Sequence, residues 1–332
     1  NPRINTRWTL PRMFVNSRPL TITLGGGYGL TSKMPTTDML YPTLEYIDIV
    51  QLNFYHNNPA FRKANAVTYI VDRTNYELNA AVNRKFELNG DVELNGNRLS
   101  VTWFREKMTS GFRTESRFNT YSYKEYDPSS VDAATITAPP QTSDFDYTTE
   151  RRFHSTQFTS NGSTLLKNGA EFTFTSQRLP VINTRFTVTG AYFSSKYLNT
   201  FPFYKVDGTT AVNNNIAQYA GYYNDTDGYL REQFNTNIIT DSYLPKLGLT
   251  ISVSLQNLWF TTSQSTWKSG TPVYYIDIDG KIHDFTEESK KDPNVNYLNE
   301  VYSEVSFRRN VAPIDMQFNL KASKDFKKKI IV

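Results

Sequence analysis

The sequence predicts an all-β protein whose fold class is an antiparallel transmembrane β-barrel with short periplasmic turns and long extracellular loops. Apolar side chains return at every second position in one segment after another, as they do on a strand with one apolar face. Short links and long connections join these segments, which is the asymmetry of an outer-membrane barrel. The 332 residues contain no apolar run long enough for a membrane-spanning helix. In no segment does a helical spacing of apolar residues describe the sequence as well as the two-residue alternation does.

The clearest strand is the stretch LGLTISVSLQNLWF at positions 247–260. Its odd positions from 247 to 255 are apolar, and its even positions are glycine, threonine, serine or glutamine. About ten residues precede the aromatic pair Trp259-Phe260, which is the length of a tilted strand that crosses a bilayer. Aromatic rings at that point suit the membrane–water boundary. We therefore expect Ile251 to face lipid near the middle of this strand, and Ser252 to face the wet interior.

The other segments repeat the alternation in chain order and predict about ten membrane strands in all. An Asn-Gly-Asn turn separates two of them, and one segment is weaker because Ile238-Ile239 breaks its phase. The alternating segments are residues 4–10, 20–28, 86–94, 98–103, 170–175, 185–192, 231–241, 247–260 and 314–321.

The connections favour a membrane barrel over a soluble β-sandwich, in which half-buried strands alternate in the same way but are spaced evenly. Within 29–82, the stretches 46–55 and 66–72 predict one hairpin that projects above the membrane. Because a hairpin adds an even number of strands, the short links before and after it stay on the same side of the membrane. The short links are Pro11–Arg18, Asn95–Asn97, Gln177–Asn183, Ser242–Lys246 and Ser323–Lys328, and the long segments are 29–82, 106–166, 194–230 and 261–312.

Composition excludes several classes of function. Cysteine is absent, which removes disulfides, thiolate metal sites and cysteine nucleophiles together. The net charge of +4 is too small in a chain of this length to indicate a nucleic-acid partner. The amino end lacks a signal segment and the carboxyl end stops abruptly at KKKIIV, so we expect the chain to be one piece of a longer protein.

Candidate chemical motifs also have structural explanations. His56, His154 and His283 stand apart in predicted loops, where solvated side chains are expected rather than a metal site or a catalytic triad. The stretch 277–280, Asp-Ile-Asp-Gly, lacks the register of a calcium loop and predicts a hairpin turn instead. The glycines at 25–27 lie in a strand, where they would let a barrel bend or admit a plug. We expect no catalytic residue, no metal and no cofactor.

Three stretches carry a resemblance to a known family. They are NRKFELNGDVELNGNRLSVTWFREKMTSGF at 83–112, the GYG…P…LYP segment at 27–42, and FNTNIITDSYLPKLGLTISVSLQNLWF at 234–260. With them the chain resembles the carboxyl half of the barrel of a TonB-dependent outer-membrane transporter, more narrowly its SusC-like branch. The resemblance implies that residues 1–332 are part of a TonB-dependent transporter β-barrel domain of about 22 strands, with the plug and the amino-terminal strands not in this chain.

The resemblance also implies a location, partners and a function. The chain would be a multi-pass barrel in the outer membrane of a Gram-negative bacterium that actively imports a nutrient, such as an oligosaccharide, a peptide or a chelate. Its partners would be the lipid bilayer, a SusD-like surface lipoprotein and the TonB complex, which acts through the missing amino-terminal part. Transport makes and breaks no bond, so the protein would not be an enzyme. A structural or assembly scaffold barrel in an outer-membrane protein complex is the alternative.

Two sets of side chains are candidates for contact with the substrate or the plug. Tyrosines in the connection 194–230 offer a flat apolar ring with a polar rim, which suits stacking on sugars, a protein interface or packing among the loops. These extracellular loop binding candidates are Tyr197, Tyr204, Tyr219, Tyr222, Tyr223 and Tyr229. The charged residues opposite the apolar positions would face the lumen or the plug, and they are Glu87, Asp91, Glu93, Arg98, Glu171, Arg185 and Asp315.

Overall fold

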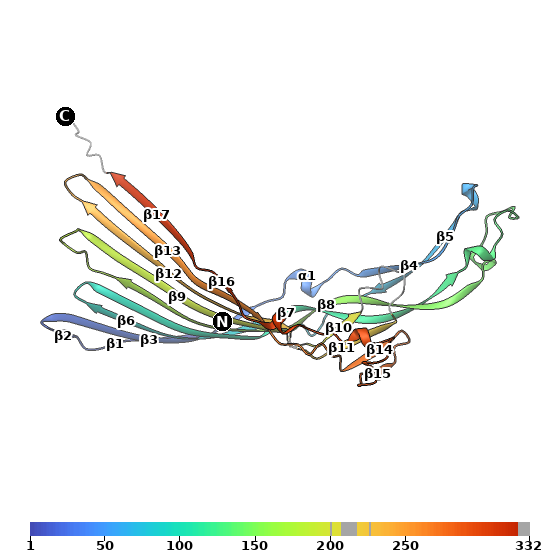
Figure 1. The fold of residues 1–332 in the computed structure, drawn as a ribbon, viewed down its shortest axis with the longest axis horizontal. Coiled ribbons are helices and arrows are strands. Elements are labelled where there is room, and N and C mark those ends of the chain that lie inside the picture. The colour runs from blue at the N-terminus through green and yellow to red at the C-terminus, as the bar shows by residue number, and fades with distance from the viewer. Residues whose placement is uncertain (200, 207–217, 226, 325–332) are drawn as a thin grey trace, which may run out of the picture.

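The protein is mostly β and is built on one large antiparallel sheet of 11 strands (Figure 1). The computed structural model describes residues 1–199, 201–206, 218–225 and 227–324. The strands of the large sheet are β1 (Arg3–Thr9), β2 (Met13–Val15), β3 (Arg18–Lys33), β6 (Ala81–Leu94), β7 (Asn97–Tyr126), β8 (Tyr147–Thr175), β9 (Thr184–Asn199), β12 (Gly228–Leu244), β13 (Leu249–Ser265), β16 (Asn310–Ala312) and β17 (Asp315–Lys324). Their order is β1-β3-β6-β7-β8-β9-β12-β13-β16, with β2 beside β3 and β17 beside β13. This confirms the predicted antiparallel sheet of long strands.

Short turns connect the strands at one end of the sheet, where Figure 1 shows the strands fanning out. Asn95 and Gly96 join β6 to β7 with φ values of 52° and 76°, the left-handed pair of a two-residue hairpin whose twist matches its strands. The predicted link at 177–183 also falls between strands, whereas the link expected at 242–246 is displaced, because β12 runs to Leu244 and the turn follows it. The link expected at 11–18 is wrong in part, because β2 occupies its middle and pairs with β3.

Long connections lie at the other end, but three of them contain more strand than expected. The segment 106–166 is mostly strand, because β7 and β8 stay paired up to Tyr126 and Tyr147. The strands are 30 and 29 residues long. Backbone groups in such a hairpin satisfy each other, and both of its faces can be wet, so it needs no apolar alternation. The loop prediction failed there for that reason.

The stretches expected to form a projecting hairpin do so as β4 (Glu45–Phe54) and β5 (Lys63–Val71). The pair forms a separate two-stranded sheet beside the extension of β7 and β8 (Figure 1). Its buried Ile47 and Ile49 pack with Tyr123 of β7 in a small hydrophobic core. Short helical turns flank these elements, namely α1 (Thr37–Leu40), η1 (Pro59–Phe61), η2 (Pro128–Ser130) and η3 (Thr142–Asp144).

A second unit outside the large sheet is a four-stranded sheet in the order β10-β11-β14-β15, and we call it the external unit because it lies outside the large sheet. It is built from β10 (Phe203–Val206), β11 (Tyr219–Tyr223), β14 (Tyr274–Asp277) and β15 (Ile282–Asp284), followed by η5 (Asn296–Leu298) and η6 (Glu304–Phe307). The segments 194–230 and 261–312 are therefore not plain loops as expected, although 207–217 and much of the link 323–328 lie outside the described residues. The hairpin turn predicted at Asp279-Gly280 is confirmed between β14 and β15, with Gly280 at a φ of 83°.

No helix in the described part of the chain is both long enough and apolar enough to cross a bilayer.

Candidate functional site

One face of the large sheet is polar, and the strand register places all seven predicted lumen-facing residues on it. Directly opposed residues of antiparallel strands point to the same side of a sheet. Glu93 lies opposite Arg98, and Glu171 lies opposite Thr102. Opposed pairs of this kind, followed from strand to strand, place the seven residues on one surface of the sheet. We call it the polar face, and its predicted members are Glu87, Asp91, Glu93, Arg98, Glu171, Arg185 and Asp315.

The opposite side, which we call the apolar face, carries large side chains that are exposed. Trp8 lies opposite Leu24, and Leu88 lies opposite Trp103, so the rows run continuously across neighbouring strands. Exposed members of the apolar face are Ile4, Trp8, Leu24, Tyr28, Phe86, Leu88, Val92, Leu99, Val101, Trp103, Met316, Phe318 and Leu320. A water-soluble monomer rarely exposes an apolar surface this wide.

Charged groups on the polar face pair with one another near β1, β3 and β6. The Asp91 carboxylate lies 3.0 Å from Nη2 of Arg98 and 3.6 Å from Nη2 of Arg7. Ser100 donates a hydrogen bond of 2.5 Å to the same carboxylate. Each of these acids and bases already has a partner within the sheet, which fixes their positions on the polar face.

The glycine run of β3 makes room beside this charged cluster. A Cβ atom at Gly25 would lie 2.2 Å from Oδ1 of Asn89, and one at Gly27 would lie 2.6 Å from Oδ1 of Asn5. The two amide side chains therefore lie over the strand where no other residue would leave space. A cavity of about 380 Å³ opens there, lined by both asparagines and by Asp91. The predicted use of these glycines to admit a plug stays a prediction.

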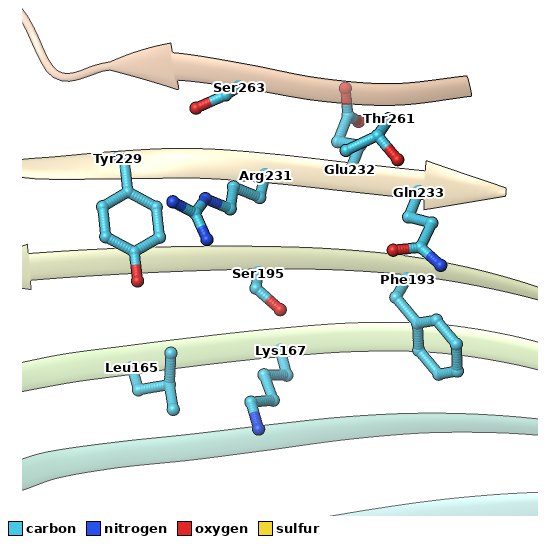
Figure 2. Close-up of a pocket in the computed structure, with 10 residues that line it drawn as sticks. All are labelled: Leu165, Lys167, Phe193, Ser195, Tyr229, Arg231, Glu232, Gln233, Thr261 and Ser263. Carbon is cyan, nitrogen blue, oxygen red and sulfur yellow. The ribbon is translucent and has the colours of Figure 1, made fainter. Parts of the chain in front are cut away.

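A larger cavity of about 590 Å³ lies on the polar face nearer the external units. Figure 2 shows Tyr229 and Arg231 side by side on β12, with Ser195 on β9 and Lys167 on β8 in the neighbouring rows. Tyr229 stacks on Tyr197 with the ring centroids 5.4 Å apart. Both tyrosines were expected in an external loop, and that placement is wrong: they belong to β9 and β12 of the large sheet.

The remaining predicted tyrosines gather in the four-stranded sheet. Tyr222 stacks on Tyr274 with centroids 4.2 Å apart and packs edge-on against Tyr204. Tyr219 packs edge-on against a ring of β14. Tyr223 is only 1% exposed, stacks on a ring of β10 and donates a hydrogen bond of 2.5 Å to the carbonyl of Leu298. Burial raises the pKa of Tyr223 to about 12, so the ring stays neutral and works as core.

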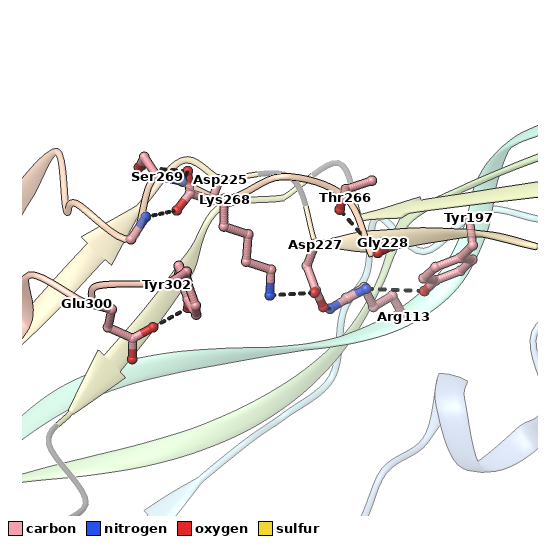
Figure 3. A network of polar contacts seen from close by, with 11 residues as sticks. Arg113, Tyr197, Asp225, Asp227, Gly228, Thr266, Lys268, Ser269, Glu300 and Tyr302 are labelled. Atoms are coloured by element: carbon pink, nitrogen blue, oxygen red, sulfur yellow. Dashed lines mark hydrogen bonds and ion pairs between the residues drawn. The ribbon is translucent and has the colours of Figure 1, made fainter. Parts of the chain in front are cut away.

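A polar network ties the four-stranded sheet to the large sheet (Figure 3). Asp227 lies between Lys268, 2.7 Å from its Nζ, and Arg113 of β7, 3.3 Å from its Nη2. Arg113 also donates a hydrogen bond of 3.2 Å to the Tyr197 hydroxyl. Asp225 accepts hydrogen bonds from the backbone N–H groups of 269 and 270. The connections on both sides of the external unit are thereby joined.

Acid should weaken this network. Burial opposes ionisation of Asp227, but hydrogen bonds and charge from Lys268 and Arg113 hold its pKa below the ordinary value of 3.8. A carboxyl whose pKa is lowered by folding contributes stability above its unfolded pKa, and that stability is lost as the pH falls through the lowered value. We expect Asp227→Asn to lower the urea midpoint of the external unit at pH 6, measured by near-ultraviolet circular dichroism, and the difference from the unchanged protein to disappear as the pH falls through the lowered pKa of Asp227. An equal difference at both pH values would contradict the ion-pair explanation.

The histidines support structure in the described residues. His154 lies on β8 and His283 on β15, so their expected loop positions are wrong, whereas His56 lies in a loop. His154 Nε2 is 2.9 Å from Oε1 of Glu45, and His283 Nε2 is 2.6 Å from Oδ2 of Asp277. Within the described ranges, no three metal-binding side chains gather in one place.

Sequence reasoning missed the cations that border the larger cavity and the Asp227 network. Arg113 falls in the segment 106–166 that was interpreted as a loop, and Lys167 lies between that segment and the strand expected at 170–175, so their face was not assigned. Extending the alternation of β8 backwards from Glu171 by steps of two reaches Lys167 and would have placed it on the polar face. Comparisons of the chain with family models, with curated proteins and with solved structures found no match.

Proposed function

We propose that this chain is part of the wall of an outer-membrane β-barrel that actively imports a nutrient. The observation that carries the proposal is the division of one long-stranded sheet into a polar face and an exposed apolar face. Lipid tails would cover the apolar face, because exposure of apolar pairs such as Leu88 and Trp103 to water is unfavourable. The polar face would line a wet interior.

The two ends of the sheet support an orientation. Short turns such as 95–96 would face the periplasm, and the tall hairpins and the four-stranded sheet would stand outside the cell. In the proposed mechanism, substrate is captured outside between these units and a SusD-like lipoprotein. The TonB complex then acts through a plug that the amino-terminal part of the barrel holds, and opens a path along the polar face. No bond of the substrate is made or broken.

Labelling from outside intact cells tests the orientation. The chain has no cysteine, so one introduced thiol is a unique label site. Lys246→Cys lies exposed in a short turn, and Ser143→Cys lies exposed beyond the end of β7. A membrane-impermeant maleimide should modify Cys at 143 in intact cells and Cys at 246 only after the outer membrane is permeabilised. Modification of position 246 in intact cells would reject the orientation, and equal access to both sites would reject the membrane placement.

Uptake distinguishes import from scaffolding. A strain without the protein should lose energy-dependent accumulation of its nutrient, tested with labelled oligosaccharides and peptides, and the restored gene should return it. A protonophore should abolish the restored uptake, because TonB-dependent transport is driven from the inner membrane. A scaffold barrel would leave uptake unchanged and would release other surface proteins instead.

A further inference from the structure

We propose that the cavity between β8, β9, β12 and β13 is a recognition subsite for a solute that carries a carboxylate beside a flat apolar surface, as an acidic sugar does. The inference rests on the proposed function for its place in import and deepens it by naming the substrate class. Four features of the cavity carry the inference, namely its cations, the engagement of the nearby acids with other partners, its rings and its size.

The two cationic residues flank one serine in the same row. Lys167 and Arg231 each lie directly opposite Ser195, one on β8 and the other on β12. Because neighbouring strands are about 4.8 Å apart, their Cα atoms are about 9.6 Å apart with the hydroxyl between them. Ser263 follows in the same row on β13. The row therefore places two cationic residues and two hydroxyl groups in the lining of one cavity.

The acids beside these cations are engaged elsewhere. Glu106 lies opposite Lys167 but is 4.0 Å from Nζ of Lys85, which also binds Glu87 at 2.9 Å. Glu232 also lines the cavity, but its carboxylate lies 2.7 Å from Nη2 of Arg309 and accepts a hydrogen bond of 2.8 Å from the Tyr192 hydroxyl. Among the described residues, neither Lys167 nor Arg231 has a carboxylate within ion-pair distance. The cavity thus holds positive charge that the sheet itself does not neutralise.

Aromatic rings form one wall of the same cavity. The guanidinium carbon of Arg231 lies 4.6 Å from the centroid of the Tyr229 ring, which holds the cation beside the ring. The Tyr229 ring is nearly parallel to that of Tyr197, with an interplanar angle of 24°. Phe193 closes the cavity on the neighbouring strand. A flat apolar patch next to a cation fits the ring of a sugar acid, whose C–H face stacks while its carboxylate binds.

The volume of about 590 Å³ lies within the range of pockets that hold small ligands. Tyr229 in the lining stacks on Tyr197, whose hydroxyl accepts a hydrogen bond from Arg113 of the Asp227 network, so the cavity lies near that network. A solute that enters from outside along the polar face would meet this subsite early. Selection of an anion there would precede movement along the path.

Binding of a matched pair of probes to the purified intact protein in detergent micelles tests the subsite. Trigalacturonate carries carboxylates, and its fully methyl-esterified form is neutral but of similar shape. We expect isothermal titration calorimetry to show binding of trigalacturonate that Lys167→Gln and Arg231→Gln each weaken by about tenfold or more. The ester should bind at least about tenfold more weakly than the acid, because its charge is missing.

Lys196→Gln is the matched control, because it removes the same charge one residue from Ser195 but on the apolar face. It should leave the affinity unchanged. Equal binding of acid and ester, an equal loss in Lys196→Gln, or no binding of trigalacturonate would each overturn the inference. The test does not depend on membrane orientation. If trigalacturonate does not bind but the labelling and uptake results are as expected, the subsite is rejected and the proposed function stands. If trigalacturonate binds but the labelling result is not as expected, the import role is rejected and the subsite stands.

Discussion

The Leu255→Arg protein should largely fail to reach a folded, heat-resistant state in the outer membrane. Leu255 lies on the apolar face between Ile238 of β12 and Phe318 of β17, well inside β13 and four residues before the aromatic pair at 259–260. In the proposed barrel, the guanidinium would stand in the hydrocarbon near the bilayer midplane, at a cost of about 2–4 kcal/mol. The measurement is the fraction of protein whose mobility on a gel shifts only after heating.

Gln256→Arg is the matched control. Gln256 is exposed on the polar face between Asn237 and Gln317, so the same charge should be tolerated there with nearly normal assembly. Equal harm from both changes would show that neither face contacts lipid. Ile251, expected near the middle of the strand, is a weaker test, because it is close to the start of β13 and the cost falls to about 0–1 kcal/mol near the membrane boundary.

Tyr223→Ala should unfold the four-stranded external sheet and leave the large sheet intact. The ring is buried with Val295 and Leu298, and its truncation removes both the stacked contact with Phe203 and the hydrogen bond to the Leu298 carbonyl. Removal of a buried aromatic ring typically costs about 3–5 kcal/mol, which is a large share of what a small unit can have. Limited proteolysis of the micelle-bound protein should then cut within 266–309, with the heat-modifiable mobility preserved.

Two further variants separate packing from polarity. Tyr223→Phe keeps the ring and loses only the hydroxyl, so it should cost about 0.5–1.5 kcal/mol and resist protease. Tyr222→Ala removes a half-buried ring and should do less damage than Tyr223→Ala. If Tyr222→Ala makes the external unit as sensitive to protease as Tyr223→Ala does, the main core of the four-stranded sheet would not lie on the face that carries Tyr223.

Period-two alternation predicted the lower part of the large sheet well. It placed Glu87 and Arg185 on one face and Leu88 and Val188 on the other, and the observed register agrees. The signal exists because only one side of those strands is apolar, which forces every second residue to differ. The Asn95-Gly96 turn was equally readable, since few residue pairs adopt positive φ at both positions.

The upper part could not be read in the same way. Where β7 and β8 continue beyond their pairing with β6 and β9, both faces meet polar surroundings, so Arg113 carries no periodic contrast with its neighbours. The Asp227 network joins residues more than a hundred positions apart, from Arg113 to Lys268, and no local pattern records such a meeting. The burial of Tyr223 beside the half-exposed Tyr222 likewise depends on a segment about seventy positions later.

The irregularity between Phe234 and Asn235 has a consequence for any residue-by-residue accessibility scan. Phe234 lies opposite Phe260 while Asn235 lies opposite Leu258, so Trp259 is one residue more than β12 can match. Below this β-bulge, odd-numbered residues of β13 belong to the apolar face, and above it even-numbered residues do. A spin-label or quencher profile along β13 should therefore oscillate with period two, lose its rhythm at 259, and resume in the opposite phase. A Fourier treatment of the whole strand would cancel the two halves and report no periodicity, although each half alone is fully ordered.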